Sequence, residues 1–318
     1  MLAAEVIRAQ GIDVLALFFE TPFFGSSRAR KSARGMGLPL KVVDITRRHL
    51  EVVRRPKHGY GSHLNPCVDC HALMFRIAGE MLASEGCAFV FTGEVLGQRP
   101  MSQNKGSLNR IAKESGLGGL LVRPLSAKRL APTIPEENGW IQREALLDLQ
   151  GRSRKPQIEM ARQRNITDYP SPAGGCLLTE KGFSRRLKDL FETRTEIETR
   201  ELELLKFGRH FRLSPQAKLV VGRNKRENEI IRSLAGEDDI TLKSVSAPGP
   251  TALLSGDPSE ELLLLAAGIT ASYSDTSNQE ISDISVGTPE DEQEGEAGAG
   301  QVWSISVHDK REFKRHLI

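Results

Sequence analysis

Cys87-Ala88-Phe89-Val90-Phe91-Thr92-Gly93-Glu94-Val95-Leu96-Gly97-Gln98 gives the clearest indication of the fold in the first half of the chain. Its apolar start predicts a short buried strand, and the Thr-Gly pair predicts a turn at the carboxyl end of that strand. Ligands bind at this edge of open α/β sheets. The candidate ligand-binding residues are therefore Thr92, Gly93, Glu94 and Gln98, and a plain strand-to-loop turn is the alternative.

Strand-like and helical segments alternate on both sides of this stretch. Strand-like apolar runs cover residues 13–19, 40–45 and 118–125, a basic helix or loop covers 26–36, and an amphipathic helix covers 72–84. Strands separated by helices are typical of βαβ units in a parallel sheet. We therefore predict an α/β domain over residues 1–180.

The second half has a different pattern. A helix over residues 181–195 is expected to connect to a smaller α+β domain over residues 196–318, with strands at 218–221 and 240–245. Asp257, Pro258 and Glu260 predict an N-cap, a first-turn proline and an acidic third residue for a further helix.

Composition and charge narrow the class of protein. The 318 residues carry a net charge of +3, of which residues 285–300 contribute −5, so the remainder carries +8. This excess is compatible with a polyanionic partner. No apolar run reaches the roughly 18 residues of a membrane span, and no secretory segment is visible. We expect a cytoplasmic protein without a membrane contact.

Two basic runs lie in loops rich in proline and glycine. They are Arg54-Arg55-Pro56-Lys57 and Arg152-Ser153-Arg154-Lys155. Such runs either contact nucleic-acid phosphates or form solvated faces. Under the first interpretation the RNA-binding residues are Arg54, Arg55, Arg152, Arg154 and Lys155.

The segment Cys67-Val68-Asp69-Cys70-His71 has several possible functions. The spacing fits covalent haem attachment, which would need export. A structural zinc site would need a second pair of ligands. The two remaining thiols are Cys87, expected in a buried strand, and Cys176, which follows two glycines and suits a reactive or metal-bound thiolate. All four thiols could also be incidental.

Three motifs together resemble those of a known family. Asn65-Pro66-Cys67-Val68-Asp69-Cys70 resembles the first cysteine motif of the tRNA 2-thiouridylases, and Thr92 to Gln98 looks like the nucleotide-side motif of the 4-thiouridine synthases. Gly174-Gly175-Cys176-Leu177-Leu178-Thr179 resembles the segment with the second catalytic cysteine. These enzymes belong to the PP-loop ATP pyrophosphatase superfamily, whose fold is adenine nucleotide alpha hydrolase-like.

The second domain is similar to the NFACT-type RNA-binding module. The matching points are Val220-Val221-Gly222-Arg223-Asn224 with Asn228, then Ala247-Pro248-Gly249, and then the helix with Pro258. This resemblance implies that RNA is a partner.

The PP-loop resemblance implies an ATP-dependent tRNA uridine thiolase. ATP with Mg²⁺ would adenylate a uridine carbonyl, and AMP would leave when sulfur attacks. Either Cys67, Cys70 and Cys176 hold a [4Fe-4S] cluster, or Cys176 carries a persulfide that Cys70 resolves. The extra thiol at Cys67 favours the cluster. The sulfur donor would be sulfide or the persulfide of a cysteine desulfurase.

One departure from the family pattern concerns the phosphate cradle. The Ser-Gly-Gly-x-Asp-Ser loop and the first strand of the family have no counterpart, because Met1-Leu2-Ala3-Ala4 resembles the helix that follows that loop. Either the natural chain begins further upstream, or the domain has lost ATP binding. The second case predicts a non-catalytic tRNA-binding or RNA-binding protein with a degenerate PP-loop domain.

Overall fold

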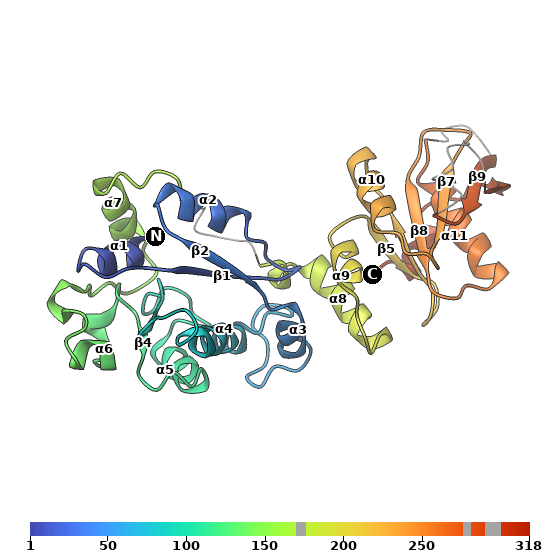
Figure 1. Ribbon diagram of the computed structural model, residues 1–318. Helices are drawn as coiled ribbons and strands as arrows, with labels where there is room; N and C mark the ends of the chain where they lie inside the picture. The colour runs from blue at the N-terminus through green and yellow to red at the C-terminus, as the bar shows by residue number, and fades with distance from the viewer. Residues whose placement is uncertain (170–175, 276–280, 290–299) are drawn as a thin grey trace. The chain divides into compact units, whose positions relative to one another are not determined.

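The computed structural model describes residues 1–169, 176–275, 281–289 and 300–318 (Figure 1). The chain divides into two compact units, Met1–Thr179 and Glu180–Ile318. The two glycines before Cys176, which belong to the second cysteine motif, lie outside the described residues.

The amino-terminal unit is an α/β structure. Its helices and strands are α1 (Leu2–Arg8), β1 (Ala16–Glu20), α2 (Ser27–Gly35), β2 (Leu40–Asp44), α3 (Thr46–Arg54), α4 (Cys67–Met81), β3 (Val90–Phe91), α5 (Lys105–Glu114), β4 (Leu121–Val122), α6 (Ile134–Glu137) and α7 (Lys155–Gln163). β1 pairs in parallel with β2, from Ala16↔Leu40 to Glu20↔Asp44. β3 pairs in parallel with β4 through Val90↔Leu121 and Phe91↔Val122. The predicted parallel pairing is therefore confirmed, but within the described residues of this unit it forms two separate pairs and not one sheet.

The core of this unit lies beside α1. Ala3, Val6 and Ile7 of α1 pack with a set of residues from β4 and the following loops, which includes Val122, Leu125, Ile141 and Leu146. The predicted strands at 87–91 and 118–125 are shorter in the structure. A strand is held by its ladder partners, and among the described residues β3 and β4 pair only with each other.

The carboxyl-terminal unit contains a six-stranded antiparallel sheet of order β10-β9-β7-β8-β6-β5 (Figure 1). Its elements are α8 (Lys181–Thr193), α9 (Thr199–Leu204), β5 (Arg209–Arg212), β6 (Lys218–Val221), α10 (Lys225–Ser233), β7 (Ile240–Ser244), β8 (Thr251–Ser255), α11 (Glu260–Ser272), β9 (Ile281–Gly287) and β10 (Gln301–Ser306). The helices and the antiparallel sheet of this unit agree with the predicted α+β domain.

Helices cover the sheet from both sides. Ala266 and Ile269 of α11 pack on Leu242 and Leu254. Ile231 of α10 belongs to a second cluster with Val220 and Leu253. Since successive residues of a strand point to opposite faces, Leu253 and Leu254 place α10 and α11 on opposite faces of the sheet.

The helix expected to connect the domains belongs to the carboxyl-terminal unit. Asp189 of α8 binds Arg212 of β5 at 2.7 and 2.9 Å and Lys218 of β6 at 3.4 Å. Burial lowers the pKa of Lys218 to about 8 against the raising effect of Asp189. These contacts attach α8 to the sheet.

The predicted N-cap of α11 is wrong by two residues. Ser259 caps this helix, and its hydroxyl accepts a hydrogen bond from the backbone nitrogen of Leu262 at 3.4 Å. Serine is as favourable as aspartate at the N-cap, and a helix capped by Ser259 has Glu260 and Glu261 in its first turn, where acidic side chains are favoured.

None of the helices in the described part of the chain combines the length and the apolar character that a bilayer crossing requires.

Candidate functional site

A cavity of about 560 Å³ lies at the carboxyl end of β3, where the sequence predicts a ligand site. Its lining includes all four residues that were predicted to bind the nucleotide, Thr92, Gly93, Glu94 and Gln98. Arg99, Arg154 and Tyr169 also line it. Guanidinium groups beside an aromatic ring can bind a phosphate and a base. The structure therefore gathers the predicted residues around one cavity.

Glu94 is held inside the unit by two neighbours. Its side chain is 3% exposed. One carboxylate oxygen lies 2.8 Å from His71 Nδ1, and the other accepts a hydrogen bond from Arg123 Nε at 2.8 Å. Burial raises the pKa of Glu94, but His71 and Arg123 outweigh burial and the net pKa is lowered. Glu94 therefore positions the loop after β3, because both of its oxygens already have partners.

The other predicted basic residues are spread over the unit. Arg154 reaches the cavity, whereas Arg152 and Lys155 beside it are exposed to solvent. Arg54 and Arg55 lie at the end of α3 and are not part of the cavity lining. Of the two runs, only the second borders the candidate site.

The three predicted ligand thiols lie near one another. Cys67 and Cys70 occupy the first turn of α4, one helical turn apart, and Cys176 lies just before Leu177–Thr179. A charged thiolate at Cys176 or Cys67 would raise the pKa of Cys70, and a charged thiolate at Cys67 would raise the pKa of Cys176. The three thiols are therefore close enough for their charges to interact. The positive charge of Arg99 lowers the pKa of both Cys67 and Cys176. Arg99 therefore connects the thiols to the cavity.

Two polar residues near the thiols were not predicted. His49 Nε2 lies 2.9 Å from Cys70 Sγ, and Cys67 Sγ donates to Asn65 Oδ1 at 3.1 Å. Burial lowers the pKa of His49 to about 4, so its ring is neutral near pH 7. No spacing in the sequence indicates His49, because it reaches Cys70 only through the packing of α3 against α4.

Burial sets the protonation of the thiols. It raises the pKa of Cys176 to about 11, raises that of Cys70 well above its usual range, and also raises that of Cys67. Thiols with such values are protonated at neutral pH. Since the thiolate is the nucleophile and the metal ligand, bound metal would have to displace these protons.

The three thiols match a three-cysteine [4Fe-4S] cluster in the number and type of ligands. Within the described residues, however, no group of three His, Cys, Asp or Glu side chains is arranged to hold a metal ion. A cluster held by Cys67, Cys70 and Cys176 therefore stays a prediction.

The lining of the cavity fits a phosphate better than Mg²⁺. Arg99 and Arg154 can bind phosphate oxygens. Glu94 is the acidic residue of the described lining, and its oxygens are engaged by Arg123 and His71. No carboxylate oxygen of this lining is therefore free to bind Mg²⁺.

In the carboxyl-terminal unit, the quoted motifs meet at the start of α10. Asn228 of α10 donates from Nδ2 to the carbonyl oxygen of Gly249 at 3.3 Å. A methyl group on Gly222 would lie 2.0 Å from Asn228 Oδ1, so a side chain at this position would displace the Asn228 amide from its observed place. Asn224 caps α10 by accepting from the backbone nitrogen of Glu227 at 3.0 Å. Segments 27 residues apart therefore form one local structure.

Positive charge is unequally divided between the two units. Residues 1–179 contain 25 Lys and Arg against 16 Asp and Glu, a net charge of +9. Residues 180–318 contain 19 Lys and Arg against 25 Asp and Glu, a net charge of −6. Lys225 and Arg226 at the start of α10 are exposed basic residues in the acidic unit. Long-range attraction of a polyanion therefore comes from the amino-terminal unit.

One family model matches part of the second unit. Residues 208–303 match the family model of the NFACT protein RNA binding domain. These residues therefore form an NFACT-type RNA-binding domain, as the motifs around Gly222 and Gly249 predict. No curated protein matches the chain.

Several solved structures are distantly similar. Among them is the C-terminal part of the fibronectin/fibrinogen-binding protein from Streptococcus suis, at 12% identity and a TM-score of 0.31, over 85% of this chain and 98% of that chain. A likeness at this TM-score determines neither fold nor function.

Proposed function

We propose that this protein binds RNA, with tRNA as the substrate class, and that both units take part. The match of residues 208–303 to the NFACT RNA-binding model is the observation that carries the proposal. The unit that contains this match has a net charge of −6, whereas the other unit has +9. Because RNA affinity depends strongly on neutralised phosphates, we infer that the NFACT domain recognises the RNA while the amino-terminal unit supplies electrostatic affinity.

The basic run beside the cavity tests the contribution of the first unit. We expect Arg152→Ala/Arg154→Ala to weaken the binding of unfractionated tRNA by about 10-fold. The slope of log affinity against log salt concentration should fall by about 2, because two phosphate contacts are lost. Arg154 borders the cavity and Arg152 is exposed. Fluorescence anisotropy over a series of salt concentrations measures both quantities.

The matched control is Arg162→Ala/Arg164→Ala, at the other end of α7. It removes the same charge, and Arg162 is already paired with Glu159 at 2.9 Å. We expect this variant to bind tRNA nearly as well as the unmodified protein. Equal losses in the two double variants would mean that net charge alone, and not the cavity side of α7, binds RNA.

The nearness of the three thiols favours a second function, sulfur transfer to a uridine of the bound RNA. A [4Fe-4S] cluster would hold sulfide from the donor, and this sulfide would replace the uridine oxygen, which leaves with AMP after ATP has adenylated it. Cys67, Cys70 and Cys176 would hold the cluster, His49 would orient Cys70, and Arg99 would lie between the thiols and the nucleotide cavity. ATP would be the activating substrate, bound at Thr92, Gly93 and Gln98 with its phosphates toward Arg99 and Arg154.

Iron content tests the thiol site independently of activity. After anaerobic reconstitution we expect a brown protein, and we expect Cys67→Ala, Cys70→Ala and Cys176→Ala each to lose iron and acid-labile sulfide to background. Cys87→Ala is the matched control and should keep both, because Cys87 lies outside the thiol group. A colourless reconstituted protein, or full iron in Cys176→Ala, would contradict the cluster.

A further inference from the structure

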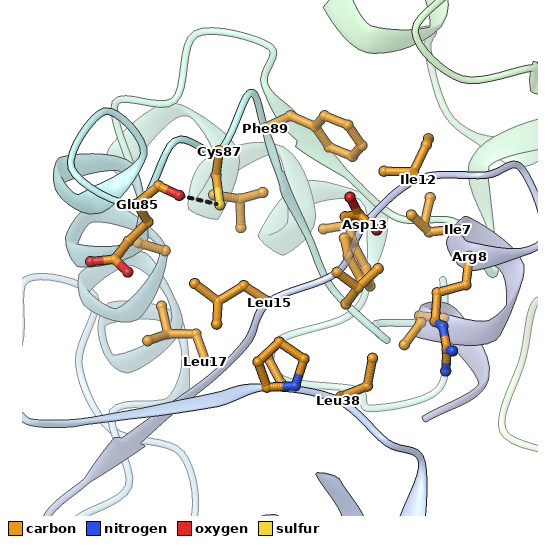
Figure 2. Close-up of a pocket in the computed structure, with 18 of the residues that line it drawn as sticks. Ile7, Arg8, Ile12, Asp13, Leu15, Leu17, Leu38, Glu85, Cys87 and Phe89 are labelled. Carbon is orange, nitrogen blue, oxygen red and sulfur yellow. Dashed lines mark hydrogen bonds between the residues drawn. The ribbon is translucent and has the colours of Figure 1, made fainter.

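A second cavity of the amino-terminal unit, of about 830 Å³, does not suit RNA. Figure 2 shows the apolar side chains around it, among them Leu15, Leu17 and Phe89, together with Cys87. Its described lining holds one basic side chain, Arg8, and two acidic ones, Asp13 and Glu85. Phosphates need positive charge, so the contacts of the NFACT domain with RNA are to be found on the surface of the carboxyl-terminal unit.

Basic side chains gather at one end of the six-stranded sheet, where β5 begins and β6 ends. Arg209 is the first residue of β5 and pairs with Val221, the last residue of β6. Arg223 follows two residues later, and Lys225 and Arg226 are the first residues of α10. All four basic residues belong to the segment that matches the RNA-binding family.

Glu227 fixes this end of the sheet but neutralises only one of these charges. Its carboxylate accepts hydrogen bonds from the backbone nitrogens of Gly208 at 3.2 Å and Arg223 at 3.0 Å, and from the Arg223 guanidinium at 2.6–3.0 Å. Lys225 and Arg226 are exposed, and neither forms an ion pair with another described residue. Their charges are therefore available to an anion.

Arg186 of α8 adds a positive charge beside Arg223. Its Nη1 donates to the carbonyl oxygen of Gly208 at 3.4 Å, and its buried Nε has no hydrogen-bond partner among the described residues. Burial lowers the pKa of Arg186, and the charge of Arg223 lowers it further. The carboxylates of Glu180 and Glu227 only partly offset these two effects. An anion beside the two guanidinium groups would relieve their repulsion.

A stacked pair lies at the same end of the sheet, on the side of α11. Cζ of Arg209 lies 4.6 Å from the centre of the Tyr273 ring, and this ring also packs against Phe211, with ring centroids 6.1 Å apart. Arg209 and Tyr273 are both half-buried, so each keeps some exposed surface. Planar guanidinium groups and aromatic rings are the surfaces on which unpaired RNA bases stack.

The loop between β7 and β8 joins these two groups of residues. The carbonyl oxygen of Gly249 accepts the hydrogen bond from Asn228 of α10, and the carbonyl oxygen of Pro248 accepts one from the backbone nitrogen of Asp275, beyond α11, at 2.8 Å. A Cβ atom at Gly249 would lie 2.5 Å from Ser274 Oγ. The start of α10 and the end of α11 are therefore held in a fixed relation, which lowers the cost of ordering a binding surface.

We propose that the NFACT domain binds an unpaired stretch of RNA at this end of the sheet, with phosphates on Arg186, Lys225 and Arg226 and a base stacked on Arg209. Loops and single-stranded ends of RNA offer such bases, whereas a base inside a duplex is already stacked on its neighbours. This inference rests on the proposed RNA binding, and it names the part of the RNA that the domain contacts.

Lys225→Ala/Arg226→Ala in the complete chain tests the phosphate contacts. The probe is a single-stranded oligouridine of about 12 nucleotides, followed by fluorescence anisotropy at low salt. We expect the affinity to fall by about 10-fold. Lys310→Ala/Lys314→Ala is the matched control, because it removes the same charge from exposed positions of the same unit, and its affinity should stay within about twofold. Equal affinities of the two double variants would overturn the site.

Arg209→Lys tests the stacking, because it keeps the charge and removes the planar guanidinium. We expect oligouridine to bind about 5-fold more weakly, and a blunt RNA duplex of the same length to bind unchanged. Tyr273→Phe keeps the ring under Arg209 and should bind both probes normally. If Arg209→Lys changes the binding of both probes equally, or of neither, the base does not stack there.

The unmodified chain separates this inference from the proposed function. A chain that binds neither tRNA nor oligouridine would contradict RNA binding altogether. A chain that binds both, with variants that stay folded by thermal unfolding and bind like their controls, would leave RNA binding intact and show that this end of the sheet is not the site.

Discussion

Glu94→Gln is expected to lower the free energy of unfolding of the amino-terminal unit by about 3–5 kcal/mol. The substitution removes the negative charge that lies 2.8 Å from Arg123 Nε, and the Arg123 side chain is 7% exposed. A buried guanidinium without a counter-charge is costly, because water cannot replace the lost partner. Chemical denaturation followed by circular dichroism measures the loss.

Glu159→Gln is the matched control for this prediction. Glu159 also binds an arginine, Arg162, but the two side chains are 49% and 78% exposed. Exposed ion pairs contribute little because water screens them, so we expect no measurable change. A Glu94→Gln protein as stable as this control would mean that Glu94 is not a structural anchor and that its carboxylate is available to a ligand.

Gly256→Ala is expected to unfold or severely destabilise the carboxyl-terminal unit. Gly256 has a φ of +106°, and a Cβ atom there would lie 1.8 Å from the carbonyl oxygen of Gln216. The conformation alone costs about 1–2 kcal/mol for an L-residue. The overlap is with backbone that leads into β6, so relieving it would shift the ladder between β6 and β8. We expect a total loss above about 3 kcal/mol.

Gly182→Ala provides the control, because it makes the same chemical change in α8. A Cβ atom at Gly182 would meet nothing within 4 Å. Alanine in a helix is favoured over glycine by about 0.5–1 kcal/mol, so this variant should be slightly more stable. Thermal unfolding of the two variants compares them directly, and similar melting temperatures would contradict the turn geometry at Gly256.

The sequence pattern predicted which segments are strands better than it predicted how they pair. The apolar run at 13–19 covers all of β1 except Glu20, and the run at 87–91 contains β3, because short apolar runs between helices are a local signal. Which strands pair with each other depends on contacts between segments that are far apart in the sequence, and no local pattern predicts these contacts. Cys87 was expected in the core of a strand for the same reason, whereas it lines the open cavity.

The candidate site was predicted in part. The position of Thr92 to Gln98 follows from a general property of α/β sheets, and the nearness of Cys176 to Cys67 was implied by the order of the motifs. His49 and Arg123 were missed, because each contacts its partner across 21 and 29 residues of chain with no recognisable spacing. Such pairs are fixed only by the packing of whole elements.

The RNA-binding residues illustrate a further difficulty. The basic runs at Arg54 and Arg152 were easy to see, but both lie outside residues 208–303, the segment that matches the RNA-binding family. That segment belongs to an acidic unit, so charge counting alone would have excluded it. The resemblance of the segment around Gly222 to the NFACT-type module indicated it instead, and the structure shows that this segment makes a close contact with Asn228.

Binding of unfractionated tRNA to the complete chain, measured from about 50 to 200 mM salt, tests the central claim most directly. The account predicts a dissociation constant in the micromolar range or below at the lowest salt, with affinity that falls steeply as salt increases. Folded protein that does not bind tRNA at low salt, or binding that does not change with salt, would contradict RNA binding as the function of this protein.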